Sequence, residues 1–206
     1  LPMNVQRSEV EDPVYDMKFS EEEIDTAIYG KNDPENGAAF YRDAVAKADS
    51  SDAAEAAEYI LDKIKGAKRP VFMIGHGANG ETEKMLTDLA RVHHIPMITS
   101  VLARSVLKFD DPLNFGCIGG AYGHRYANMI ANAKSDLLLC FGISLCTRQI
   151  GTKVHEFAKN AEIIRVDIDP YNLQREIHEG RKGEKCFCVS AEDVACKLTE
   201  QQAQIG

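Results

Sequence analysis

The amino-acid sequence predicts an α/β domain in which a parallel sheet carries helices on both faces. From residue 52 onward, short apolar segments alternate with amphipathic helices, a pattern typical of parallel β-α-β units. The segment Asp136–Phe141, DLLLCF, is continuously apolar after its first residue, as expected of a strand buried on both faces. Glycine or aspartate follows most of the predicted strands, where the chain must turn into the next helix.

The first predicted helix begins at Asp52, an N-cap residue with Glu55 three positions later, and ends at Gly66. Its apolar residues share one face: Ala57, Ile60, Leu61 and Ile64. Further helices are predicted at Glu81–His94, Arg125–Ala133, Val154–Ala158 and Ala191–Gln202, the last capped by Ser190. The predicted strands are Pro70–Ile74, Pro96–Thr99, Asp136–Phe141, Glu162–Val166 and Lys185–Val189, with a glycine-rich loop at Gly116–Gly123.

Composition excludes several functional classes. The formal net charge is -8 and the basic residues are scattered, which argues against nucleic-acid and membrane-surface partners. No apolar run is long enough to span a membrane. None of the six cysteines forms a C-x-x-C pair, so a zinc site is disfavoured and reduced thiols of a cytoplasmic protein are expected. Cys140 and Cys188 are interpreted as small core hydrophobes.

The first 50 residues carry little periodic apolar pattern. Residues 8–50 are acidic and rich in turn residues, and they are predicted to be a linker with a short helix around Ala38–Ala46. The sequence starts at Leu1–Gln6 without methionine or targeting character. These features lead us to expect a fragment of a longer protein, with one folded domain over residues 51–206.

Ligands of open parallel sheets bind at the carboxyl ends of the strands, so the turns after the strands are the candidate site. The turn Gly75–Gly80 matches G-x-G-x-x-G, a pattern that lets a pyrophosphate approach the backbone and a helix N-terminus. The second strand, however, ends in Thr99-Ser100 without the carboxylate of an ordinary NAD-binding domain. The alternative interpretation is that these glycines only make a tight strand-to-helix turn.

Two aspartates and one histidine are further candidates. Asp167 and Asp169 follow a buried strand, where a carboxylate could accept hydrogen bonds from ribose hydroxyls. Alternatively, Asp169 caps a short helix that opens at Pro170. His124 follows the glycine-rich loop, whereas His93 and His94 end a helix and suit a capping role.

Five segments in the same order and spacing resemble the central domain of thiamine diphosphate-dependent enzymes, most closely those of the acetolactate synthase type. They are PVFMIGHGA, IPMITS, DDPLNFGCIGGAYGHRYAN, SDLLLCFG and AEIIRVDIDP. The resemblance covers roughly residues 52–200. It implies a Rossmann-like three-layer sandwich with about six parallel strands. It also makes residues 1–7 the tail of a preceding pyrimidine-binding domain.

The resemblance implies a parent enzyme that uses thiamine diphosphate and Mg²⁺ to decarboxylate a 2-oxo acid and join the product to a second carbonyl compound. The parent would be a homodimer or homotetramer. In this family the activating glutamate lies in the pyrimidine-binding domain and the G-D-G motif in the diphosphate-binding domain. This chain contains no G-D-G. We therefore expect no catalytic residue and no metal ligand within it.

In flavin-binding members of the family, the central domain holds FAD at the strand ends. The resemblance therefore implies one of two alternatives here: an FAD or ADP site, or an empty, vestigial nucleotide site. The positions carried over are Gly75, Gly77, Ser100, Gly119, Gly123, Gly142, Ser144, Arg148, Asp167 and Asp169. Two departures predict weak binding. Ser144 stands where the family has an arginine, and the bulky loop Val101–Ser105 replaces a glycine-rich one.

Two other classes of protein remain open at this point. One is a free-standing nucleotide-binding protein, such as a transhydrogenase-like domain or an NAD-dependent deacylase. The deacylase would require paired zinc cysteines, which this sequence lacks. The other is a structural module that spaces two catalytic domains and supports oligomerisation.

Overall fold

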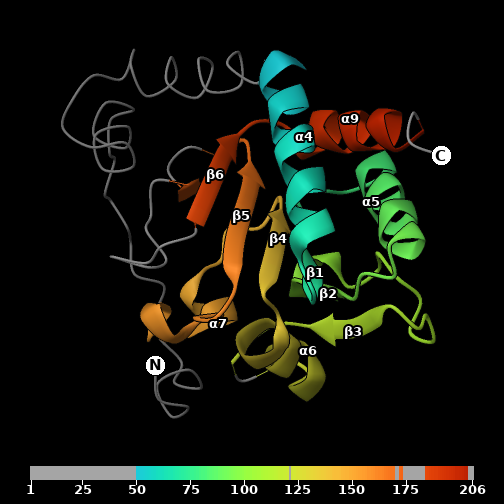
Figure 1. Ribbon diagram of the computed structural model, residues 1–206. Helices are drawn as coiled ribbons and strands as arrows, with labels where there is room; N and C mark the ends of the chain where they lie inside the picture. Colours follow the sequence, from blue (N-terminus) through green and yellow to red (C-terminus); the bar gives the residue numbers. More distant parts are fainter. Residues whose placement is uncertain (1–49, 121, 170–171, 174–183, 204–206) are drawn as a thin grey trace, which may run out of the picture. The chain divides into compact units, whose positions relative to one another are not determined.

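The structure of the chain is a computed structural model that describes residues 50–120, 122–169, 172–173 and 184–203 (Figure 1). The predicted tail at 1–7, the linker up to residue 49 and the helix around Ala38–Ala46 lie outside these residues. Within them, no helix is both long and apolar enough to cross a bilayer.

A single six-stranded sheet forms the centre of the domain, and all its strand pairs are parallel. Its strands are β1 (Pro70–Ile74), β2 (Met97–Thr99), β3 (Asn114–Cys117), β4 (Leu137–Phe141), β5 (Glu162–Asp167) and β6 (Glu184–Cys188). The order β3-β2-β1-β4-β5-β6 means that β2 and β3 are added on one side of β1. The chain then crosses back, so that β4, β5 and β6 are added on the other side of β1. We call the two ends of the strands the amino edge and the carboxyl edge of the sheet.

Helices cover both faces, which confirms the predicted three-layer fold. One face packs against α4 (Ser50–Gly66), α5 (Glu81–Val92) and α9 (Ala191–Ala203), which gather on one side of the sheet in Figure 1. The other face packs against α6 (Arg125–Met129), the π-helix η2 (Ile130–Lys134), α7 (Thr147–Ile150) and the 3₁₀ turn η3 (Val154–Glu156). A further 3₁₀ turn, η1 (Val101–Ala103), follows β2.

Each face of the sheet carries its own apolar cluster. Alternate strand residues such as Phe72 and Phe141 face α4, α5 and α9, and their rings meet edge to face at 5.5 Å between centroids. Their neighbours Met73 and Cys140 face α6 and η2 instead. Every residue of β4 is buried, as the apolar run predicted. Full burial raises the pKa of the Cys140 thiol to about 12, so this cysteine is an inert core residue.

Several local predictions about element boundaries, one strand and one cysteine are wrong. Strand β3 was not predicted, because Gly116, with φ 89°, lies inside it and disguises the strand as a loop. Helix α4 begins at Ser50, which places Asp52 inside the first turn rather than at the N-cap. The segment predicted as a helix at Val154–Ala158 is only the turn η3. Cys188 is partly exposed on an edge strand, not in the core.

Other predictions of caps are confirmed. Ser190 accepts a hydrogen bond from the backbone N–H of Glu192 at 3.2 Å. His93 and His94 close α5, and His94 adopts a left-handed φ of 53°. Helix α4 ends at Gly66, and the predicted apolar face of this helix is buried.

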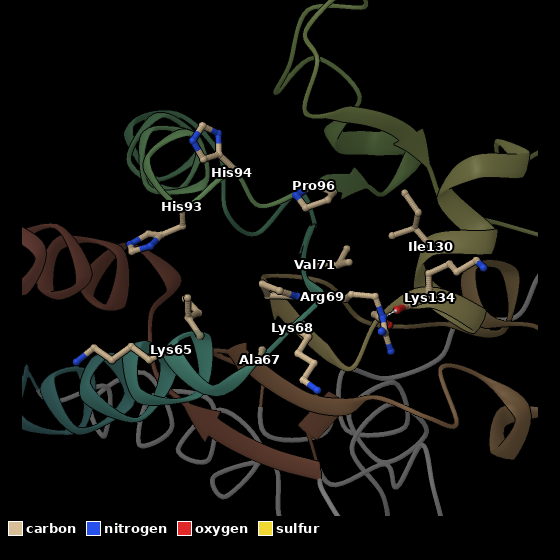
Figure 2. A pocket seen from close by; sticks show the side chains of 13 residues that line it. Lys65, Ala67, Lys68, Arg69, Val71, His93, His94, Pro96, Ile130 and Lys134 are labelled. Carbon is tan, nitrogen blue, oxygen red and sulfur yellow. Dashed lines mark hydrogen bonds between the residues drawn. The ribbon is translucent and has the colours of Figure 1, made fainter.

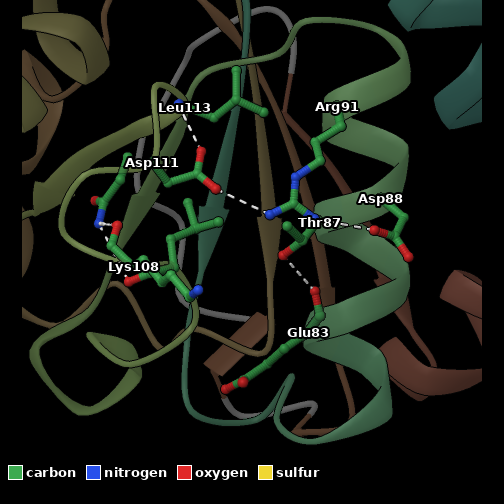
Figure 3. Close-up of polar contacts among 9 residues, drawn as sticks. Glu83, Thr87, Asp88, Arg91, Lys108, Asp111 and Leu113 are labelled. Atoms are coloured by element: carbon green, nitrogen blue, oxygen red, sulfur yellow. Dashed lines mark hydrogen bonds and ion pairs between the residues drawn. The ribbon is translucent and has the colours of Figure 1, made fainter.

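A polar network attaches the loop before β3 to α5 (Figure 3). The carboxylate of Asp111 accepts a hydrogen bond from the backbone N–H of Leu113 at 2.9 Å. It also pairs with Arg91 at 3.0 Å, and Arg91 in turn pairs with Asp88 at 3.1 Å. The N–H of Leu113, aided by Arg91, holds the pKa of Asp111 below its ordinary value.

Candidate functional site

A cavity of about 420 Å³ opens at the carboxyl edge, beside the ends of β2, β3 and β4. Three of the predicted site residues line it, namely Ser100, Ser144 and Arg148. Its wall also includes Arg104 and Tyr122. The loop Val101–Ser105, which we expected to obstruct a ligand, forms η1 and contributes one side of the cavity.

The cavity is positively charged. Arg104 and Arg148 both line it and are exposed, and the described residues offer no ion pair to either of them. No carboxylate lines the cavity. The two guanidinium groups and the Ser100 hydroxyl line one cavity, and together such groups can bind a phosphate or diphosphate. Arg104 was not among the site residues predicted from the sequence. Its position soon after the predicted strand Pro96–Thr99 could have indicated it, because ligands of parallel sheets bind where the strands end.

The predicted glycines after β1 and β4 pack directly against one another. The N–H of Gly75 donates to the carbonyl of Phe141 at 2.9 Å, and the N–H of Gly77 donates to the carbonyl of Gly142 at 3.0 Å. A Cβ atom on Gly75 would lie 2.0 Å from the carbonyl oxygen of Gly142. Glycine is required here for close approach of two backbones, which supports the structural interpretation of the G-x-G-x-x-G turn.

These contacts limit what the turn after β1 can bind. The amides of Gly75 and Gly77 are already used by the protein, so they do not face a ligand. Glu81 and Glu83 occupy the first turn of α5, where their negative charges suit the helix dipole and repel an anion. A phosphate is therefore better placed near Arg104 and Arg148 than on this turn.

The glycines after β3 build a compact loop beside α6. The Asn128 side chain donates to the carbonyl of Gly119 at 2.8 Å and accepts from its N–H at 3.3 Å. A Cβ on Gly123 would lie 2.2 Å from the carbonyl oxygen of Gly119. His124 uses Nδ1 to accept the N–H of Cys117 at 2.9 Å. The geometry gives these residues a role in holding the loop, and His124 is not aimed at the cavity as a base.

The aspartates after β5 lie farther along the carboxyl edge and do not line the cavity. Asp167 accepts the N–H of Asp169 at 2.9 Å, and Asp169 accepts from the side chain of Asn172 at 2.8 Å. Asp169 also accepts the backbone N–H of Asn172 at 3.4 Å, as expected of a residue that caps a helix. Burial raises the pKa of Asp167. The nucleotide role of both residues stays a prediction.

Metal-binding side chains do not cluster in the part of the chain that the structure describes. Nowhere in ranges 50–120, 122–169, 172–173 and 184–203 do three His, Cys, Asp or Glu side chains gather to hold a metal ion. The sequence has no G-D-G motif either. The arrangement of Arg104, Arg148 and Ser100 at the carboxyl edge supports binding of an anion.

Comparison with known proteins agrees with the fold and the resemblance. The sequence pattern of the family described as "Thiamine pyrophosphate enzyme, central domain" matches residues 57–180. Acetolactate synthase 1, chloroplastic, of Oryza sativa subsp. japonica is 33% identical over 131 residues, which are 63% of this chain and 19% of that protein. Acetolactate synthase of Mycobacterium leprae is 34% identical over 116 residues, 56% of this chain and 18% of that protein.

The matched part of the chain thus spans about a fifth of the length of these relatives. The family pattern covers more than half of the chain, from α4 to beyond β5. The match includes strands β1 to β5 and ends before β6 and α9. The chain therefore belongs to the thiamine pyrophosphate enzyme family, of which it is a central domain of the acetolactate synthase-like kind.

Proposed function

We propose that this chain is the non-catalytic central domain of a thiamine diphosphate- and Mg²⁺-dependent enzyme that decarboxylates a 2-oxo acid and joins the product to a second carbonyl compound. The family match over residues 57–180 carries this proposal. Thiamine diphosphate activates the 2-oxo acid in such enzymes. In this proposal, binding of thiamine diphosphate falls to the pyrimidine-binding and diphosphate-binding domains of a parent homodimer or homotetramer.

The product of the complete open reading frame tests this activity. Supplied with thiamine diphosphate, Mg²⁺ and pyruvate, it is expected to release carbon dioxide and form acetolactate. The 206-residue chain alone serves as the control and is expected to form none. Failure of the complete protein to act on any of a series of 2-oxo acids would contradict the proposal. Saturable binding of thiamine diphosphate by the chain alone, at micromolar concentration, would contradict its non-catalytic role.

We further propose that the cavity at the carboxyl edge binds an adenine nucleotide. Arg104 and Arg148 provide charge for a diphosphate, and Ser100 provides a hydroxyl beside them. At about 420 Å³ the cavity is near the lower end of the range for small-molecule sites, roughly 300–1,000 Å³. This size favours ADP, or the ADP half of FAD, over a fully enclosed flavin dinucleotide.

Calorimetric titration with ADP and FAD tests the nucleotide site. Removing one charge-assisted contact by Arg148→Ala or Arg104→Ala is expected to weaken ADP binding by about one to two decades. Lys159→Ala, which removes an exposed lysine outside the cavity, is the matched control. Unchanged binding in both arginine variants would place the nucleotide elsewhere, whereas an effect of Asp167→Ala would move it toward β5.

We also propose a cytoplasmic location for the chain. All six cysteines lie within described ranges and none forms a disulfide, as expected of reduced thiols. Fractionation of cells that express the complete protein, with detection of residues 50–203 by an antibody, checks this location. Recovery in an organelle would contradict it.

A further inference from the structure

A second cavity, of about 510 Å³, lies on the amino edge of the sheet, opposite the proposed nucleotide site (Figure 2). The starts of β1 and β2 form its floor, and the last turns of α4, α5 and η2 form its walls. None of the residues predicted as a site from the sequence lines it. A ligand at this cavity would not depend on the proposed function of the chain.

The floor of this amino-edge cavity is apolar. Val71, Pro96 and Ile130 lie around its centre in Figure 2, and Ile64 and Ala67 extend the same surface. Val71 and Ile64 are largely buried, so the floor is part of the folded domain rather than a loose surface. Such a floor can hold a flat apolar group through contact and release of water.

The rim of the amino-edge cavity is basic. Lys68, Arg69, His93 and Lys134 surround the floor, and Arg69 lies beside Lys134 because its Nε donates to the carbonyl of Lys134. No carboxylate lines the cavity, and the described residues provide no ion pair to any of these four side chains. The four side chains are exposed, and their charges lie together around one hollow.

The adjacent carboxylate of Asp136 does not neutralise this rim. Its two oxygens accept the backbone N–H groups of Lys68 and Arg69 at 2.9 and 2.8 Å. These bonds fix the chain just before β1. They leave the ammonium group of Lys68 and the two terminal nitrogens of Arg69 for another partner, while the Nε of Arg69 is used by Lys134. Three helices also end at this cavity, and cations near helix C-termini offset their dipoles. That effect accounts for basic residues at the helix ends, but not for a hollow with an apolar floor between them.

We propose that the amino-edge cavity binds an organic phosphate with a flat apolar body, at a site distinct from the cavity at the carboxyl edge. The apolar body would lie on Val71, Pro96 and Ile130. The phosphate would lie between Lys68, Arg69 and Lys134, because a guanidinium and ammonium groups match its charge and its acceptor oxygens. A dianion gains more than a monoanion from several cations at one rim.

Titration of the 206-residue chain with 1-naphthyl phosphate tests this site, with inorganic phosphate and 1-naphthol as matched fragments of the probe. Binding of 1-naphthyl phosphate is expected to be at least about tenfold tighter than that of either fragment, since only the whole probe uses both floor and rim. The His93 ring resonances are expected to shift on binding. Lys68→Gln with Lys134→Gln is expected to weaken binding about tenfold or more, whereas Lys159→Gln leaves it unchanged.

The following outcomes would overturn the proposal. Equal binding of inorganic phosphate and 1-naphthyl phosphate, or equal competition by an acidic peptide, would indicate a general basic surface. Unchanged affinity in the double variant would remove the basic rim from the site. Weaker binding in Arg148→Ala would place the probe at the carboxyl edge. If the double variant fails to fold by circular dichroism, each single variant is titrated, and a loss below about twofold in both counts against the site.

Discussion

The two edges of the sheet differ in how much side-chain carboxylates contribute to the hydrogen bonds that hold them together. At the carboxyl edge, the turns after β1 and β4 are joined backbone to backbone through Gly75, Gly77 and Gly142. At the amino edge, backbone bonds such as that from the N–H of Asp136 to the carbonyl of Arg69 at 3.3 Å are supplemented by side-chain carboxylates. Asp136 binds the chain before β1, and Asp111 binds the chain before β3. A backbone junction tolerates almost no added atom, whereas a carboxylate junction depends on charge and therefore on pH.

The strongest test of this difference is Gly75→Ala. Its Cβ would lie 2.0 Å from the carbonyl oxygen of Gly142, so the turns must separate and the bonds between them break. We expect a loss of about 3 kcal/mol or more in the free energy of unfolding, measured by urea denaturation.

Gly66→Ala is the matched control at the amino edge, because no atom lies within 4 Å of its added Cβ. We expect it to be neutral or to stabilise the domain by up to about 1 kcal/mol. Comparable losses in the two variants would show that the edges do not differ in this way.

Asp136→Ala tests the carboxylate junction before β1. It removes the acceptor of two backbone N–H groups, and we expect a loss of about 1–2 kcal/mol after allowance for solvent screening. Asp136→Asn retains one acceptor oxygen and should lose less. An equal loss in both variants would indicate that packing, and not the hydrogen bonds, accounts for the effect.

Asp111→Asn is expected to cost about 0.5–1 kcal/mol at pH 7, because Arg91, its partner, is half exposed. The pKa of Asp111 is lowered in the folded protein, so its carboxylate stabilises the fold above the ordinary value near 4. The difference in the free energy of unfolding between wild type and variant should disappear as pH falls through the lowered pKa. A difference that is constant from pH 7 to pH 2 would refute the assignment.

The smallest effect is expected for Asp167→Asn at the carboxyl edge. Burial raises the pKa of Asp167, so its ionised form opposes folding at neutral pH. Asparagine can still accept the N–H of Asp169, so the variant should be more stable than wild type by a few tenths of a kcal/mol at pH 7. The advantage should shrink on acidification, as Asp167 gains its proton. Opposite signs for Asp111 and Asp167 in the same pH series would sharpen the comparison between the edges.

The sequence predicts the fold well where one physical signal dominates. The apolar run of β4, the periodic face of α4 and the caps at Gly66 and Ser190 each depend on neighbouring residues, and each is found in the structure. Strand β3 was missed because it is a short strand containing Gly116, and its identity depends on pairing with β2. Pairing of distant segments is not visible in a local pattern.

The candidate sites show the same limit more strongly. Ser100, Ser144 and Arg148 were predicted and do share a cavity, because the carboxyl ends of parallel strands meet at one edge. Gly75 and Gly77 have the spacing of a phosphate loop, but the approach of Gly142 uses their amides, and no local pattern reveals that approach. The amino-edge cavity was missed entirely, since Lys68, His93 and Lys134 become neighbours only through the packing of three helix ends.

The reversal of strand order between β1 and β4 has a consequence for folding. Residues of β1 pair with residues of β2 that follow about 25 positions later in the sequence. Their partners in β4 follow 67 positions later, as between Pro70 and Leu137. The half-sheet of β1, β2 and β3 therefore can form while the other side of β1 is still unpaired. Until β4 arrives, that side presents an apolar edge open to other chains. During synthesis, β1 is therefore an exposed edge strand until β4 has been made, although it is a central strand of the finished sheet.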